Sequence, residues 1–194
     1  MFKMKIYLEG GNKPEEIVYA LTDKKALSQS KNKTIMILNY TIRDPERIKK
    51  EMIFFPKYFS KIGAKKVYIA SNFNKNELHT KVKEAGLIYL PGGDTKFLME
   101  NLKEKKLISL LKNSLDKVII GNSAGAIVLC NEGFFFEKER IRKFKGIGLI
   151  EISIYVHYNT KNRNDLKILS KDRKIYPIPE RKTLIIENGE IKPN

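Results

Sequence analysis

Short apolar runs recur along the first 130 residues of the chain and are separated by longer stretches of mixed polar and apolar residues. A short apolar run bounded by polar or turn-forming residues is typical of a strand that is covered on both faces. On this pattern we predict five strands, over residues 5–9, 34–40, 67–71, 87–91 and 117–120. The first of them ends at Gly10-Gly11.

The stretches between these runs have the apolar spacing and the end signals of helices. Asp44 is expected as an N-cap with Pro45 at the first helical position, and Pro56 should kink or split the helix that follows. Further helices are predicted over residues 74–86 and, as one or two helices, over 96–113. The alternation predicts an α/β fold with a doubly wound, mostly parallel sheet and helices on both of its faces.

The pattern changes after residue 133. Residues 146–159, 174–179 and 183–191 are strand-like, and Asn188-Gly189 is typical of a hairpin turn. No internal repeat, linker or low-complexity tract divides the sequence. We therefore expect residues 1–194 to form one domain with a β-rich C-terminal segment.

Composition limits the classes of protein to which the chain can belong. Its 194 residues and 42% hydrophobic content suit one globular domain with a core. It has no apolar run of about 18 residues and no signal-peptide cleavage pattern, which predicts a cytoplasmic protein without a membrane partner. One cysteine and two histidines cannot build a disulfide or a zinc cluster, so we expect no metal and no cofactor. Cys130 is expected to be a buried apolar residue.

The formal net charge of +16 raises the question of nucleic-acid binding, because a basic surface attracts phosphates. The basic residues stand in short runs separated by acidic and apolar residues, without the glycine and aromatic pattern of an RNA-binding sheet. We therefore expect no obligate nucleic-acid partner. The sequence leaves open whether the chain forms a homodimer.

The segment GNSAG follows the last of the five predicted strands and precedes an apolar run. Glycine on both sides of Ser123 suits the sharp strand-to-helix turn that exposes a serine nucleophile. The N–H of Ala124 would then point toward a developing oxyanion, with Gly92 or Gly93 supplying the second donor. Both glycine turns follow strands of the predicted parallel sheet, where ligands gather. A tight connection or a phosphate-binding loop is the alternative for the same residues.

His157 is the expected base for this serine. It ends the apolar run IEISIYV, so it should lie at the end of a strand, whereas His79 lies inside a charged helix. Several carboxylates remain open as the acid that orients the imidazole. Glu137, which follows three phenylalanines, is our choice. The other candidates are Glu139 as the next choice, then Glu132, Glu151, and Asp165 or later acids.

Four stretches in order carry a family resemblance: YLPGGDTKFLMENL, GNSAGA, GIGLIEISIYVHYN and IYPIPERKTLIIENGEI. Together they resemble the dipeptidase E and cyanophycinase family of serine peptidases. The resemblance runs from about residue 65 to the end of the chain. It implies a fold similar to the class I glutamine amidotransferases, of the flavodoxin-like type, and a triad of Ser, His and Asp or Glu.

The resemblance also implies roles for particular residues. Carried over by position, Ser123 is the nucleophile, His157 the base, and Gly93 with Ala124 the oxyanion donors. The family acid falls roughly fifteen residues after the serine, which favours Glu137.

The resemblance extends to the substrate. Gly92 and Asp94 lie in the turn expected to bind it, although Asp94 stands where the family commonly has Asn, and Asn122 replaces an aromatic residue before the serine. Dipeptidase E prefers an N-terminal aspartate, which the family binds with an arginine after the histidine, and Arg163 matches that position. An arginine can bind a carboxylate through two hydrogen bonds.

These features predict a serine peptidase that hydrolyses short peptides, with dipeptides that begin with aspartate as candidate substrates. A catalytically inactive binding module of the same fold is the first alternative. An α/β-hydrolase esterase is less favoured because only 34 positions separate Ser123 from His157. A Rossmann enzyme is disfavoured because no G-x-G-x-x-G follows the first strand.

Overall fold

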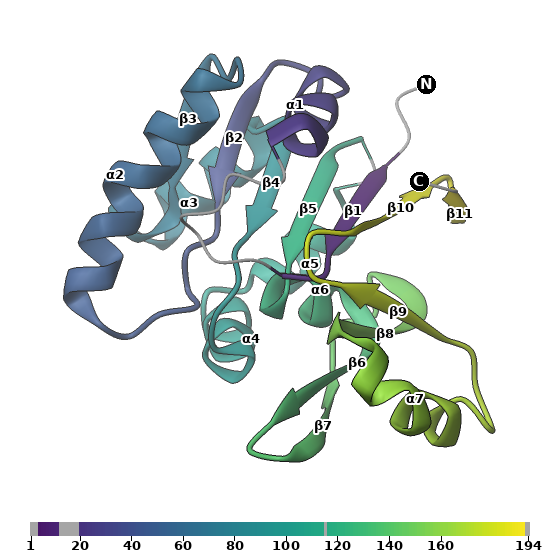
Figure 1. The fold of residues 1–194 in the computed structure, drawn as a ribbon. Helices are drawn as coiled ribbons and strands as arrows, with labels where there is room; N and C mark the ends of the chain where they lie inside the picture. The colour runs from purple at the N-terminus through teal and green to yellow at the C-terminus, as the bar shows by residue number, and fades with distance from the viewer. Residues whose placement is uncertain (1–3, 12–19, 115, 193–194) are drawn as a thin grey trace.

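The computed structural model describes residues 4–11, 20–114 and 116–192, and its centre is a seven-stranded sheet (Figure 1). Four neighbouring pairs, from β1 across to β3, are parallel, and β10 and β11 add an antiparallel edge. In spatial order the strands are β11 (Glu190–Lys192), β10 (Thr183–Glu187), β1 (Lys5–Glu9), β5 (Val118–Asn122), β4 (Leu87–Leu90), β2 (Thr34–Ile37) and β3 (Lys66–Ile69).

Helices cover both faces of this sheet, as the sequence pattern predicts (Figure 1). On one face, α1 (Ala20–Ser28) and α2 (Pro45–Lys61) pack on alternate residues of the strands, and Phe55 and Phe59 of α2 contact Tyr89. The helices that supply side chains to the core on the other face are α3 (Lys75–Glu84), α4 (Thr95–Glu104), α5 (Leu107–Lys112) and α6 (Ala124–Leu129). The doubly wound α/β prediction is therefore confirmed.

A second, four-stranded sheet follows α6 in the chain. Its strands are, in spatial order, β7 (Arg140–Lys145), β6 (Cys130–Glu137), β8 (Ile150–Tyr158) and β9 (Ile175–Pro179). Strands β6, β8 and β9 are parallel to one another, and β6 and β7 form an antiparallel hairpin. The 3₁₀ turn η2 (Thr160–Asn162) and α7 (Arg163–Leu169) connect β8 to β9. This sheet is the predicted β-rich segment.

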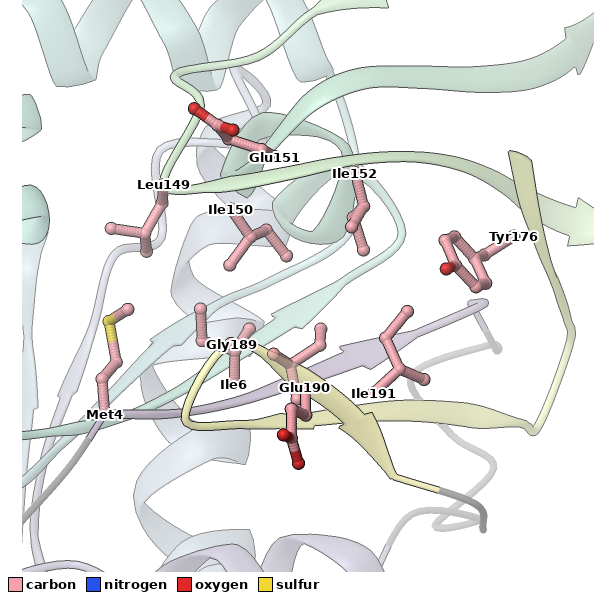
Figure 2. Close-up of a pocket in the computed structure, with 11 residues that line it drawn as sticks. Met4, Ile6, Leu149, Ile150, Glu151, Ile152, Tyr176, Gly189, Glu190 and Ile191 are labelled. Carbon is pink, nitrogen blue, oxygen red and sulfur yellow. The ribbon is translucent and has the colours of Figure 1, made fainter. Parts of the chain in front are cut away.

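The two sheets approach one another along an apolar groove of about 570 Å³ (Figure 2). Met4, Ile6 and Ile191 line it from the first sheet, and Ile152 and Tyr176 line it from the second. Additional contact comes from α6, since a Cβ on Gly133 of β6 would lie 2.6 Å from the Ile127 side chain. Buried residues of the two sheets, among them Ile6 of β1 and Ile154 of β8, belong to one apolar cluster, which packs the second sheet against the first.

Local signals in the sequence explain where the helices begin. Asp44 caps α2 by accepting a hydrogen bond from the N–H of Glu46, with Pro45 at the first helical position as predicted. Asn74 and Glu77 form a reciprocal capping box at the start of α3. These caps provide partners for N–H groups that the helices leave unpaired.

Two features of the helices differ from the sequence expectation. Helix α2 is not split at Pro56, because Phe55 and Phe59 anchor it to the sheet on either side of the proline. Helix α1 was not predicted, because its polar sequence ALTDKKALS gives only a weak amphipathic pattern. Another short element, the 3₁₀ turn η1 (Ala70–Asn72), takes up the end of the predicted strand 67–71.

Over the ranges that the structure describes, no helix combines the length and the apolar character needed to cross a bilayer.

Candidate active site

Ser123 lies on a sharp turn between β5 and α6. Its backbone has φ 46° and ψ −104°, a conformation that a residue with a side chain rarely adopts. A Cβ on Gly121 would lie 2.7 Å from the Ala126 nitrogen, and one on Gly125 would lie 2.1 Å from the Leu90 carbonyl oxygen. Both glycines are therefore required by close backbone approaches around the serine.

The second sheet brings His157 to this turn. His157 is the penultimate residue of β8, at its C-terminal end, and has φ 53°. The Ser123 Oγ lies 2.7 Å from His157 Nε2, within hydrogen-bonding distance. The two residues that the sequence singled out therefore meet, although they come from different sheets.

A carboxylate lies on the other side of the imidazole. His157 Nδ1 is 3.1 Å from Glu180 Oε1, and Glu180 directly follows β9. Because β8 and β9 are parallel and Tyr158 lies opposite Pro179, the residues at their carboxyl ends are neighbours. The side chains of His157 and Glu180 are 38% and 62% exposed, so the arrangement is open to solvent on this side.

Three successive carbonyl groups at the end of β1 hold the backbone of this constellation. The N–H of Ser123 donates to the Glu9 oxygen at 3.0 Å. The N–H of His157 donates to the Gly10 oxygen at 2.8 Å, and the N–H of Arg181, which follows Glu180, donates to the Gly11 oxygen at 3.1 Å. All three donor residues have a positive φ, between 46° and 65°.

Gly10 and Gly11 make this arrangement sterically possible. A Cβ on Gly10 would lie 2.0 Å from the Pro179 carbonyl oxygen, and one on Gly11 would lie 2.1 Å from the His157 ring. The glycine pair that ends the first strand therefore lies directly beneath the imidazole and the Glu180 turn.

The structure does not bring Glu137 to His157. Glu137 ends β6, pairs in register with Arg140 and lies 3.4 Å from Arg142. Glu139, the next choice from the sequence, lies in the two-residue turn of the same exposed hairpin, with φ 61°. Both acids therefore belong to the β6–β7 hairpin. The carboxylate next to the imidazole is instead that of Glu180.

A signal for Glu180 was present in the sequence. It follows the strand-like run IYPIP, as His157 ends IEISIYV, and residues after neighbouring parallel strands gather at one edge. The sequence alone did not indicate that these two strands are adjacent. Position at the end of a strand therefore indicates the carboxylate beside His157 better than the number of residues after the serine does.

The predicted glycine turn after β4 lies beside the serine. A Cβ on Gly92 would lie 3.4 Å from the Ser123 Cβ, and Gly93 has φ 136° with the Thr41 carbonyl oxygen 2.6 Å from the place of its missing Cβ. Ala124 is the first residue of α6, where a helical N–H has no partner within the helix. The turn and the helix start therefore flank Ser123 as expected for the two donors.

Asp94 has a structural role in the same turn. Its side chain caps α4 by accepting a hydrogen bond from the N–H of Phe97 at 2.9 Å, and it lies 3.9 Å from Arg43. The Asp94 side chain therefore has a hydrogen-bond partner and an ionic partner within the protein, without a bound substrate.

Arg163 is exposed at the start of α7 and lines an open cavity of about 660 Å³. Tyr158, the residue after His157, and Lys167 line the same cavity. The cavity therefore borders the His157 strand end and has a positive wall.

The other residues with reactive side chains have structural surroundings. His79 Nε2 lies 2.7 Å from the Lys105 carbonyl oxygen, far from the serine in the fold. Cys130 is completely buried, and burial raises the pKa of its thiol well above its usual range. In the described ranges no group of three or more His, Cys, Asp or Glu side chains is arranged to hold a metal ion.

Comparison with known proteins identifies the family of the chain. A model of peptidase family S51 matches residues 8–193. The chain belongs to peptidase family S51. This match covers almost the whole chain, from the end of β1 through the Glu180 turn.

Two similar S51-like proteins come from Listeria. Uncharacterized peptidase Lmo0363 of Listeria monocytogenes is 27% identical over 129 residues, which cover 59% of this chain and 63% of that protein. Uncharacterized peptidase Lin0382 of Listeria innocua is 24% identical over 138 residues, covering 64% of this chain and 62% of that protein. The matched part therefore spans less than two thirds of either relative.

Solved structures show the same fold over a larger share of the chain. The crystal structure of a protein described as a candidate peptidase E from Listeria monocytogenes EGD-e superposes with a TM-score of 0.68 at 19% identity. That match covers 98% of this chain and 97% of the other. A peptidase from an acI-B1 actinobacterium gives a TM-score of 0.67 at 20% identity, covering 95% and 83%.

The contact between Gly11 and the imidazole generates a prediction for this S51 chain. In Gly11→Ala the new Cβ would overlap the His157 ring, and we expect the rate of Ser123 labelling by a fluorophosphonate to fall about 100-fold. Gly63→Ala is the matched control, because Gly63 has a similar φ of 107° with no atom within 4 Å of the added Cβ. Equal labelling rates in the two variants would contradict this role of Gly11.

Proposed function

We propose that this chain is a serine peptidase that hydrolyses short peptides through an acyl-enzyme. In this proposal Ser123 is the nucleophile, His157 the general base, and Glu180 the acid that orients the imidazole. The observation that carries the proposal is the hydrogen-bonded chain from Ser123 Oγ through His157 to Glu180, with distances of 2.7 and 3.1 Å. It has the order and spacing of a nucleophile, a base and an orienting acid.

The reaction begins with attack of Ser123 Oγ on the peptide carbonyl carbon, while His157 Nε2 accepts the hydroxyl proton. The carbonyl oxygen becomes an oxyanion, for which the N–H groups of Gly93 and Ala124 are the proposed donors. His157 then gives the proton to the amine as the C–N bond breaks. Water attacks the resulting ester with His157 again as base, and the C–O bond to Ser123 breaks to release the acid product.

Glu180 acts on the imidazole and not on the substrate. An ionised carboxylate at Nδ1 keeps the proton of neutral His157 on that nitrogen, so Nε2 is free to accept from the serine. The same negative charge stabilises the imidazolium that forms when the serine attacks. Glu180 therefore takes the place that the sequence spacing assigned to Glu137.

The substrate we propose is a short peptide with an N-terminal aspartate. Arg163 lines a cavity together with Tyr158, the residue after His157, and its guanidinium can bind a carboxylate through two hydrogen bonds. Lys167 on the same cavity adds a second positive charge. These two positive residues would thus attract an acidic side chain of the substrate.

The triad assignment predicts the effects of four substitutions on the hydrolysis of an aspartyl dipeptide. Ser123→Ala and His157→Ala should each lower kcat by about 10⁴-fold or more, and Glu180→Gln by about 10²- to 10⁴-fold. Glu137→Gln, which removes an exposed carboxylate in the β6–β7 hairpin, should leave kcat unchanged. Retention of turnover in Ser123→Ala would contradict the proposal, and a larger loss in Glu137→Gln than in Glu180→Gln would contradict the choice of acid.

The substrate assignment predicts a separate effect at Arg163. Arg163→Ala should raise KM for aspartyl dipeptides about tenfold or more, with a much smaller change for alanyl dipeptides, because only the former lose a charged hydrogen bond. Arg140→Ala removes one positive charge from the β6–β7 hairpin, at a residue that does not line this cavity, and is the matched control. An equal effect of Arg163→Ala on both substrates would contradict its role in aspartate binding.

The catalytically inactive binding module makes the opposite prediction from a peptidase. It requires that a fluorophosphonate fails to label Ser123 in the wild-type protein. Mass spectrometry of the labelled chain separates the two functions without knowledge of the substrate.

A further inference from the structure

A carboxyl group lies buried directly behind the proposed nucleophile. Glu9 is the last residue of β1, and its accessible surface is 0%. It pairs in register with Asn122 of β5 on one side and with Thr183 of β10 on the other. A buried carboxylate is costly unless it is neutralised or fully hydrogen-bonded.

Glu9 contacts the Ser123 turn through both its backbone and its side chain. Its carbonyl oxygen accepts the N–H of Ser123, and its Oε2 accepts a hydrogen bond of 2.8 Å from Asn122 Nδ2. Asn122 immediately precedes the serine and is itself 5% exposed. The Glu9 side chain therefore fixes the residue from which the strained serine turn begins.

The rest of the Glu9 carboxyl group faces a second buried acid. Asp23 of α1 is 2% exposed, and the Tyr58 hydroxyl of α2 donates to its Oδ2. Glu9 Oε1 and Asp23 Oδ1 have no donor among the described residues if both groups are ionised. Each carboxyl group affects the pKa of the other through a side-chain hydrogen bond, and one proton between them would give both of these oxygens a partner.

The surroundings favour retention of that proton. Burial, and then the charge of Asp23, raise the pKa of Glu9 well above its usual range. Burial raises the pKa of Asp23 to about 6, although hydrogen bonds from Tyr58 and Glu9 oppose the shift. Over the described ranges no lysine or arginine contributes to the pKa of either carboxyl group. Both pKa shifts therefore favour the retention of a proton by the pair.

We propose that Glu9 is a positioning residue for the proposed serine chemistry: it shares a proton with Asp23, holds Asn122 and thereby sets the orientation of the Ser123 turn. The role rests on the proposed function, because it acts through the nucleophile. When the shared proton is lost, two negative charges face each other in the core without a donor between them. Repulsion then displaces the Glu9 carboxylate from Asp23, and with it the Asn122 amide to which it is hydrogen-bonded.

Glu9→Gln tests this role because glutamine keeps the size and the hydrogen bonds while it removes the titration. Its amide oxygen can accept from Asn122 Nδ2, and its amide nitrogen can donate to Asp23. In the wild type, the rate of Ser123 labelling by a fluorophosphonate should fall as the pH rises through the titration of the pair. Glu9→Gln should label within about twofold of the wild-type rate at neutral pH and should lack that fall. Glu9→Ala, which leaves Asn122 without its acceptor, should label about tenfold more slowly.

Stability should show the same titration independently of reactivity. Since the Glu9 pKa in the folded state is raised above its unfolded value of about 4.3, the folded state binds more protons. The stabilisation from the protonated pair is complete below that unfolded value and is lost as the pH rises through the folded value. The stability of Glu9→Gln, measured by urea unfolding, should decline less than that of the wild type over this range, and Glu137→Gln should follow the wild type.

Infrared spectroscopy gives a readout that needs neither labelling nor a substrate. At pH 7 the wild-type protein should have a C=O stretch of a protonated carboxylic acid, which Glu9→Gln removes and Glu137→Gln retains. Absence of that band, or identical pH profiles of labelling in the wild type and Glu9→Gln, would overturn the proposal even if Glu9→Ala does not fold. An unreactive Ser123 in every protein would instead refute the proposed function, and the infrared band would still decide whether Glu9 shares a proton.

Discussion

The whole site depends on three consecutive peptide carbonyls at the end of β1. Glu9, Gly10 and Gly11 each accept one hydrogen bond, from Ser123, His157 and Arg181 in turn. The donors come from three remote parts of the chain: the β5–α6 turn, the end of β8, and the turn after β9. One short segment therefore sets the relative positions of the serine, the histidine and the glutamate.

This arrangement explains the strained backbone of the site. Ser123, His157 and Arg181 all have positive φ values, which are unfavourable for residues with side chains. Each of their N–H groups is bound to β1, so the surrounding hydrogen bonds compensate for the unfavourable conformation. The two glycines that follow β1 complete the arrangement, because any side chain there would occupy the space of the imidazole or of the Glu180 turn.

The sequence predicted the parts of the fold that local pattern determines. Five apolar runs became the parallel strands, and the glycine turns after β4 and β5 lie side by side at one edge of the sheet. The sequence also indicated Ser123 and His157 as the candidate nucleophile and base, because each stands at the end of a strand-like run. It did not identify Glu180, because the adjacency of β8 and β9 arises from tertiary pairing and not from spacing along the chain.

Tertiary contacts also explain two other differences between the sequence-based expectations and the structure. Of the kink or split expected at Pro56, the split does not occur, since two phenylalanines pack α2 against the sheet across that residue. The pairing of Glu9 with Asp23 could not be foreseen, because the polar helix α1 was itself not predicted and a lone acid at a strand end usually faces solvent. A partner that lies on an element without a sequence signal thus requires the structure.

Nitrogen-15 NMR of His157 tests the central claim most directly, because it reports which ring nitrogen carries the proton. The account predicts a neutral imidazole protonated at Nδ1, with an Nδ1–H resonance that shifts in Glu180→Gln and is unchanged in Glu137→Gln. A proton on Nε2, or a spectrum that is the same in Glu180→Gln as in the wild type, would contradict it.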